Sequence, residues 1–146
     1  MRSRLFEIAA ALAAGTLFVN AAALNVSVSH AYLRLIPGVP AAGYFTLSNR
    51  TKAAITLTGA HSADCGMLMM HRSSTEGGMA RMEDASALAV AAGRSLSFAP
   101  GGYHLMCMDP SPRLRVGGTA TVTLEFGGGA TSDVAFTVVD ARGRPH

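Results

Sequence analysis

Hydrophobic and polar residues alternate over short stretches of this chain, and turn residues interrupt the alternation. The clearest case is the run from Thr119 to Phe126, where Thr alternates with Val and Leu before three glycines end the pattern. A period of two is typical of a strand with one buried face. Shorter runs rich in β-branched and aromatic residues predict further strands at Asn25–Leu35, Tyr44–Leu47, Ile55–Thr58, Met67–His71, Leu88–Val90, Ser95–Phe98, Tyr103–Met108 and Ser132–Val139.

The turns between these runs indicate the fold class. Ile36-Pro37-Gly38 and Asn49-Arg50-Thr51-Lys52 carry residues that favour turns. Several strands at intervals of roughly 8–12 residues, without a long helical pattern, predict an all-β domain: an antiparallel Greek-key sandwich or barrel. The alanine-rich stretch 85–92 could add one helical turn. We expect the domain to span residues 24–146, with a frayed tail at 141–146.

The first 23 residues have the layout of a secretory signal peptide. Arg2 and Arg4 precede an apolar run, Ile8 to Val19, and Ala21-Ala22-Ala23 offers small residues for cleavage. Such a leader predicts export to the periplasm. No later apolar stretch reaches the roughly 18 residues that a membrane-spanning helix needs, so the mature form is not expected to span a membrane.

Export also bears on the two cysteines. An oxidising compartment favours disulfides, and Cys65–Cys107 is the one pairing that the chain allows. In the chain-entropy model this loop would add roughly 4 kcal/mol of stability. The bridge requires the two Cα atoms to lie within about 7 Å of each other.

Composition excludes several classes of function. With 49% hydrophobic and 14% charged residues, the chain is not a disordered acidic or basic protein. Its net charge of +3 becomes +2 without Arg2, Arg4 and Glu7, and it has no basic cluster, so nucleic-acid binding has no support. No nucleophile elbow, zinc-protease motif or Ser-His-Asp grouping is evident, so we do not expect an enzyme.

Methionine and histidine carry the candidate chemistry. Seven of the eight methionines fall between Met67 and Met108. After the turn at Pro100-Gly101-Gly102, strand alternation puts His104 and Met106 on one face, about 6–7 Å apart at Cα. Thioether sulfur selects Cu(I), and imidazole binds copper well. His71 and Met82 are the available residues to complete a two-His, two-Met copper site.

Two alternatives remain open at this stage. Methionine is a common core filler, and Met67, Met69 and Met70 are assigned mainly to that role; His30 and His61 are assigned to ordinary positions. A plain β-sandwich interaction domain without metal is therefore one alternative. The other is a blue-copper electron carrier, which would need a Cys thiolate; on a regular strand, however, Cys107 faces away from His104 and Met106.

The spacing His71-x10-Met82-x21-His104-x-Met106 resembles the signature of the PCuAC periplasmic copper chaperones. Gly43-Tyr44-Phe45 and the Pro100–Met106 segment are also similar, and the resemblance covers about residues 25–140. It implies a cupredoxin-like β-sandwich that binds Cu(I) near its surface through those four residues. It also implies delivery of copper toward the copper centre of cytochrome c oxidase, sometimes with a thioredoxin-like assembly factor as partner.

The chain departs from that pattern beside the first histidine. Family members often carry Met or Glu immediately after it, whereas this chain has Arg72. A cation there would either weaken Cu(I) binding or steer a partner. The cysteines are a second variation, because the corresponding family positions are often apolar.

Overall fold

The computed structural model describes residues 24–146; the predicted signal peptide, residues 1–23, lies outside the described residues. The strands are β1 (Val26–Arg34), β2 (Ala41–Asn49), β3 (Ile55–His61), β4 (Cys65–Ser74), β5 (Arg81–Asp84), β6 (Leu88–Val90), β7 (Ser95–Phe98), β8 (Tyr103–Pro110), β9 (Thr119–Phe126) and β10 (Thr131–Val139). Two single 3-10 turns, η2 (Glu76–Gly78) and η3 (Gly127–Gly129), accompany them. Within the described part, no helix is long and apolar enough to cross a membrane.

All ten strands belong to one sheet, which confirms the predicted all-β fold. Its order is β5-β4-β8-β2-β1-β10-β9-β3-β6, and β7 pairs with β2 off this path. Neighbouring strands are antiparallel except β1 and β10, which pair in parallel. The predicted antiparallel arrangement therefore holds for every pair but this one.

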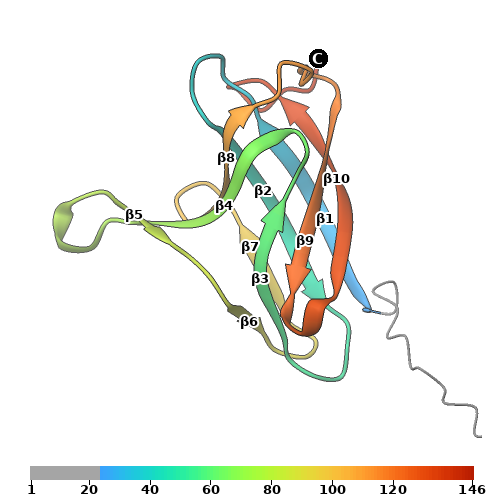
Figure 1. Cartoon of the computed structure of the whole chain (residues 1–146). Helices are drawn as coiled ribbons and strands as arrows, with labels where there is room; N and C mark the ends of the chain where they lie inside the picture. Colours follow the sequence, from blue (N-terminus) through green and yellow to red (C-terminus); the bar gives the residue numbers. More distant parts are fainter. Residues whose placement is uncertain (1–23) are drawn as a thin grey trace, which may run out of the picture.

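The sheet curls so that β3 comes to lie beside β4 (Figure 1). Strands β5 and β6 lie at opposite ends of the strand order, yet residues 85–87 alone connect them. The Ala85 amide donates to the Met70 carbonyl of β4 at 2.8 Å, which holds this connection against the sheet. The result is an open barrel with a seam between β3 and β4. The helical turn considered for residues 85–92 is wrong, because β6 pairs with β3 there.

The core fills the space that the curled sheet encloses. Phe45 of β2 contacts the rings of Phe98 and Phe136, at centroid distances of 4.5 and 5.7 Å. Aliphatic side chains from the alternate positions of the surrounding strands complete it, including Leu33, Leu47, Leu57, Leu105, Val122, Leu124 and Val138. The period-two pattern of the sequence thus places one face of each long strand in this core.

The predicted turn after β2 is confirmed and is built around one buried amide. Asn49 is almost fully buried, and its Nδ2 donates to the carbonyls of Ala53 and Val90. Its Oδ1 accepts from the Thr51 amide and hydroxyl. All the polar atoms of this side chain are therefore satisfied, as a buried amide requires.

Strand β4 runs from the barrel into a projecting arm. Its residues from Cys65 to Arg72 pair with β8, whereas those from His71 to Ser74 pair with β5. Figure 1 shows the second half of β4, the turn after it and β5 extending away from the body. Strand β5 was not predicted, because its four residues are exposed and show no apolar alternation. This arm positions the candidate site.

Candidate functional site

The antiparallel pairing of β4 with β8 places the two candidate histidines side by side. His71 is the direct register partner of His104. Their rings meet edge to face, with centroids 5.7 Å apart and planes at 89°. Both are largely withdrawn from solvent: the His71 side chain is 12% exposed and His104 is 5% exposed. Two residues separated by 33 positions in sequence therefore form one imidazole pair.

In each imidazole, one ring nitrogen lies within hydrogen-bond distance of a group that can only accept a hydrogen bond. His71 Nε2 lies 3.0 Å from Asp84 Oδ1, and His104 Nδ1 lies 3.3 Å from the Gly102 carbonyl oxygen. In the neutral rings, these nitrogens therefore carry the hydrogens and donate them. The remaining nitrogens, His71 Nδ1 and His104 Nε2, are buried and have no hydrogen-bond partner.

This arrangement fits metal ligation. A ligating histidine usually donates its second ring N–H to a carboxylate or a carbonyl, which fixes the tautomer and the ring orientation. Both kinds of acceptor occur here, one on each ring. A buried, unpaired nitrogen is costly unless something binds its lone pair. The two unpaired ring nitrogens therefore have the environment of metal-ligating histidine nitrogens.

Thioethers lie in the neighbouring rows of the same face. Met69 is the register partner of Met106, one row from the histidine pair, and Met67 is the partner of Met108, one row further. Because side chains alternate across a strand, these four methionines share the face of His71. The assignment of Met67 and Met69 to the core is therefore wrong.

Met70 shows the other half of the alternation. It is 5% exposed and belongs to the core cluster, as predicted. Met67, only three positions earlier, is 58% exposed. The sequence contained the signal that separates them: Met67-x-Met69-x-His71 mirrors His104-x-Met106-x-Met108. Pairing these two mirrored runs in antiparallel register reproduces the observed face.

Met82 reaches the same face from the arm. It lies on β5 opposite Ser73, two positions beyond His71 on β4, and is 56% exposed. Asp84, which holds His71, lies on the same strand and directly opposite that histidine. The structure thus brings His71, His104 and Met106 together on adjacent strands, and Met82 approaches from the more exposed edge. Asp84 is a site residue that sequence reasoning missed.

Arg72 does not enter this face. Its guanidinium lies over the ring of Tyr103, 5.7 Å from the centroid. Tyr103 is the register partner of Arg72 and precedes His104, so both lie on the opposite face from the imidazoles. This charge is therefore satisfied by a cation–π contact on the other side of the strands.

The predicted disulfide between Cys65 and Cys107 is present. The Cα atoms are 5.3 Å apart, within the limit expected for a bridge. Cys107 is fully buried and lies between Met106 and Met108 on the core side of β8. Residues 24–146 contain no free cysteine. The bridge thus staples β4 to β8 directly behind the methionine face.

A hollow of about 330 Å³ opens at the barrel seam beside this face. Its lining includes Met69, Asp84 and Glu125, together with backbone-rich parts of β3 and β4. Glu125 also forms an ion pair with His61, at 2.8 Å. The carboxylates of Asp84 and Glu125 therefore both line this hollow, and they favour a cation there.

The donor set selects a soft cation. In the part of the chain that the structure describes, no three His, Cys, Asp or Glu side chains gather as metal ligands. Hard ions such as Mg²⁺ and Ca²⁺ prefer several oxygen ligands, which this face lacks. Neutral imidazole and thioether donors suit Cu(I) instead.

Known proteins share this fold. The solution structure of CuI-DR1885 from Deinococcus radiodurans is 30% identical, with a TM-score of 0.61 over 79% of this chain and 76% of that one. The copper-bound PCuAC domain from PmoF2 has a TM-score of 0.65 over 79% of this chain and 92% of that one. At 24% identity, the second comparison concerns the fold alone.

Two sequence comparisons give the family. The chain is 33% identical over 120 residues to "Putative lipoprotein Lxx21020" from Leifsonia xyli subsp. xyli (strain CTCB07), covering 82% of this chain and 72% of that protein. The model of the family described as "Putative lipoprotein LpqE-like" matches residues 26–138. The chain therefore belongs to the LpqE-like family, and its barrel has the fold of PCuAC domains.

Proposed function

We propose that this protein is an exported Cu(I) carrier that binds the ion through His71, His104, Met106 and Met82. The observation that carries the proposal is the pair of buried imidazoles. In each ring one nitrogen has a hydrogen-bond acceptor beside it, and the other nitrogen has no hydrogen-bond partner. The relative from Deinococcus radiodurans, solved as CuI-DR1885, supports Cu(I) as the ion.

The four donors have complementary roles. His71 and His104 supply two oriented lone pairs on adjacent strands, so their geometry exists before the ion arrives. Met106, on β8, adds a thioether from the rigid body, and Met82 adds one from the exposed arm. All four donors are neutral, so the ion keeps its single positive charge and remains exchangeable.

An electron-transfer role has less support. A blue-copper site needs a Cys thiolate beside its two histidines. Both cysteines of this chain are in the disulfide, and Cys107 points into the core. A carrier that keeps copper as Cu(I) and passes it on fits these donors better. We propose a copper-accepting protein as the partner, either the copper centre of cytochrome c oxidase or a thioredoxin-like assembly factor, in the periplasm.

The test is an anaerobic Cu(I) titration of the purified protein against a chromophoric competitor. Met82→Leu with Met106→Leu conserves volume and apolarity but removes both sulfur donors. We expect the fold to persist and Cu(I) affinity to fall at least about a hundredfold, since even loss of a ligand's hydrogen-bonded neighbour costs about 10–100-fold.

Met79→Leu is the matched control, because Met79 is an exposed methionine of the same arm. Its affinity for Cu(I) should equal that of the parent. If the double Leu variant binds Cu(I) as tightly as the parent does, the two thioethers are not ligands and a domain without a metal role becomes the better reading.

A further inference from the structure

We infer a second Cu(I) site on the methionine face, formed by Met67, Met69 and Met108. These three thioethers are not used by the proposed first site. They lie in the rows of β4 and β8 beyond the histidine pair, in the direction of the disulfide. The site would hold one additional soft monovalent cation by ligand exchange alone, without any redox step.

The strand register brings the three sulfurs within reach of one ion. Met67 and Met108 are direct cross-strand partners, and such partners have Cβ atoms about 4.5–5.5 Å apart. Met69 follows Met67 by two positions, which places it about 6–7 Å away on the same face. Methionine has three rotatable side-chain bonds, so three such side chains can converge on a single point.

Packing does not account for these residues. A core filler gains from burial, yet Met67 is 58% exposed. Met70, on the same strand but on its inner face, is the methionine that fills the core. Met67 is exposed and Met69 and Met108 are half-buried, and none of the three belongs to the core cluster. Their positions are therefore better explained by a function of the sulfur than by the volume of the side chain.

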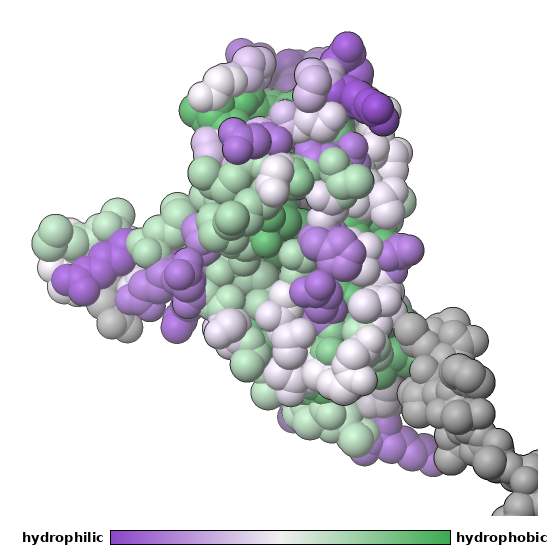
Figure 2. All heavy atoms as spheres, viewed as in Figure 1, coloured by the Kyte–Doolittle hydropathy of each residue, from purple (hydrophilic) through white to green (hydrophobic). Residues whose placement is uncertain are grey.

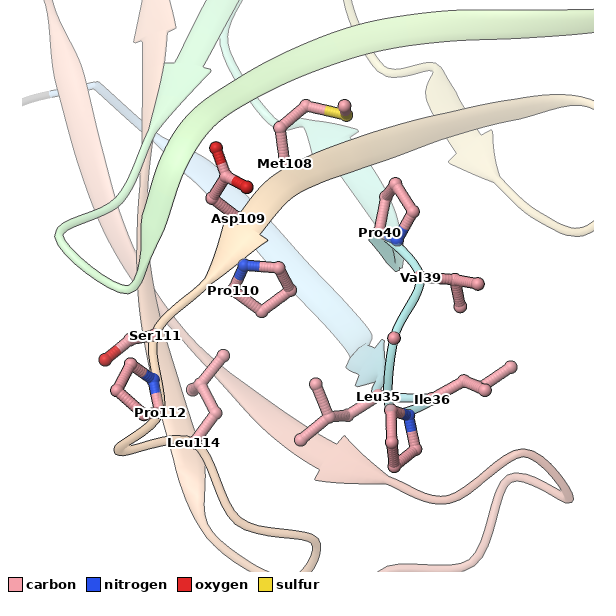
Figure 3. Close-up of a pocket in the computed structure, with 12 residues that line it drawn as sticks. Leu35, Ile36, Val39, Pro40, Met108, Asp109, Pro110, Ser111, Pro112 and Leu114 are labelled. Atoms are coloured by element: carbon pink, nitrogen blue, oxygen red, sulfur yellow. The ribbon is translucent and has the colours of Figure 1, made fainter.

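Met108 lies at the edge of an open hollow. This hollow, about 670 Å³ in volume, is lined mainly by apolar residues of the β1–β2 turn and of the segment after β8. In Figure 3, the Met108 side chain rises from β8 on the side away from Leu114, with its sulfur and terminal methyl group farthest from the strand. The sulfur is therefore not packed into the floor formed by Pro110, Pro112 and Leu114, and it remains available to an ion.

The two sites should differ in strength and in chemistry. Three thioethers without an imidazole form a weaker site than one that includes His71 and His104, because imidazole is the stronger donor for copper in this set. Thioethers carry no titratable proton, so the second site should bind equally well across the pH range in which imidazoles become protonated. It would suit a transient position on the way to or from the first site.

The experiment is an anaerobic Cu(I) titration of the purified protein, followed by NMR of its methionine methyl groups. The parent should take up two equivalents, the first shifting the methyls of Met82 and Met106 and the second those of Met67 and Met108. The variant M67L/M108L should take up one. Its affinity for the first equivalent should stay within about threefold of the parent value, since Leu conserves volume.

Two further variants separate this inference from the proposed function. H71A/H104A should lose the tight equivalent and retain the weak one, with the same shifts of Met67 and Met108. Met79→Leu should bind two equivalents like the parent. A parent that saturates at one equivalent overturns the second site and leaves the first standing. An M67L/M108L variant that still binds two overturns the assignment of these ligands.

Discussion

The two imidazoles of the site are held in opposite tautomers. His71 donates from Nε2 to a carboxylate and keeps the lone pair on Nδ1, whereas His104 donates from Nδ1 to a carbonyl and keeps it on Nε2. The carbonyl belongs to Gly102, in the turn that starts β8, so the orientation of His104 is built into the backbone. The orientation of His71 depends on a single side chain, that of Asp84.

Asp84 can therefore be tested as a positioning residue. Replacing it with Ala removes the acceptor for His71 Nε2–H, and we expect Cu(I) affinity to fall about tenfold, at the lower end of the usual range because the carboxylate is exposed. Asp84→Asn keeps an acceptor oxygen and should recover most of that loss. Competitor titrations of the parent and of the two Asp84 variants measure the change in Cu(I) affinity. An unchanged affinity in Asp84→Ala would show that packing alone orients His71.

A second residue-scale prediction concerns the C-terminal tail. Asp140 Oδ1 accepts from the amides of Arg142 and Arg144, and Oδ2 pairs with the Arg144 guanidinium. The hydrogen bond from the Arg144 amide is the main reason why the pKa of Asp140 lies below its ordinary value of 3.8. A lowered pKa means that this turn is stabilised above about pH 4 and loses that stabilisation as the pH falls through the folded pKa.

The ¹³C shift of the Asp140 carboxyl, followed by NMR across acidic pH, should give a midpoint below 3.8. Arg144→Ala removes the guanidinium but keeps the backbone amide, so it should raise the midpoint only part of the way toward the ordinary value of 3.8. A parent midpoint at or above the ordinary value would mean that residues 141–146 are frayed in solution, as the sequence suggested.

At the scale of elements, the site is built on three strands that differ in how many neighbouring strands hold them in place. Strand β8 is enclosed between β4 and β2, whereas β5 pairs with β4 alone at the edge of the sheet. Two methionines lie next to the other three donors: Met69 lies opposite Met106 on the body, and Met82, the proposed fourth ligand, lies on the arm. The sequence spacing favours Met82, and the strand register makes Met69 a direct neighbour.

Single substitutions distinguish these two thioethers. If Met82 is the fourth ligand, Met82→Leu should weaken the tight Cu(I) equivalent by about tenfold or more, whereas Met69→Leu should leave it nearly unchanged and weaken only the second equivalent. Both are volume-conserving changes, and competitor titration measures both equivalents. The reverse pattern would place Met69 in the first site.

Part of the site was predictable from sequence for a clear physical reason. The Pro100-Gly101-Gly102 turn fixes where β8 begins, so alternation correctly placed His104 and Met106 on one face and Cys107 on the other. The roles of Met67 and Met69 were not predicted. Which face of a strand is buried depends on its partner's register, and the partner of β4 lies more than thirty residues away.

At the scale of the whole molecule, the regular strands were predictable because their core faces alternate. The run from Thr119 to Phe126 became β9 with the expected bounds. The parallel pairing of β1 with β10 was not evident, because it joins opposite ends of the domain. Strand β5 owes its conformation to the backbone of β4 rather than to its own residues, which are all exposed. Figure 2 shows a largely hydrophobic surface where the arm joins the body, and a mixture of hydrophilic and hydrophobic residues along the arm.

The disulfide contributes at this scale, because it closes a loop between residues 42 positions apart. The double substitution of Cys65 and Cys107 by Ala should lower the free energy of unfolding by about 4 kcal/mol in the chain-entropy model. Urea unfolding with and without reductant measures this change. Reductant should destabilise the parent by a similar amount and leave the double variant unaffected; equal sensitivity of both proteins would contradict the bridge.

The arm also bears on how fast an ion could leave. Its edge strand is held by hydrogen bonds on one side only and buries none of its four residues, so its amides should exchange with solvent far sooner than those of β8. Each opening of the arm would move Met82 and the Asp84 carboxylate away from the site together. His71, His104 and Met106 would stay in place. Residence time on the protein would then follow the opening frequency of the arm rather than equilibrium affinity. A cross-link that closed the arm would slow handover to an acceptor while leaving the saturated protein unchanged.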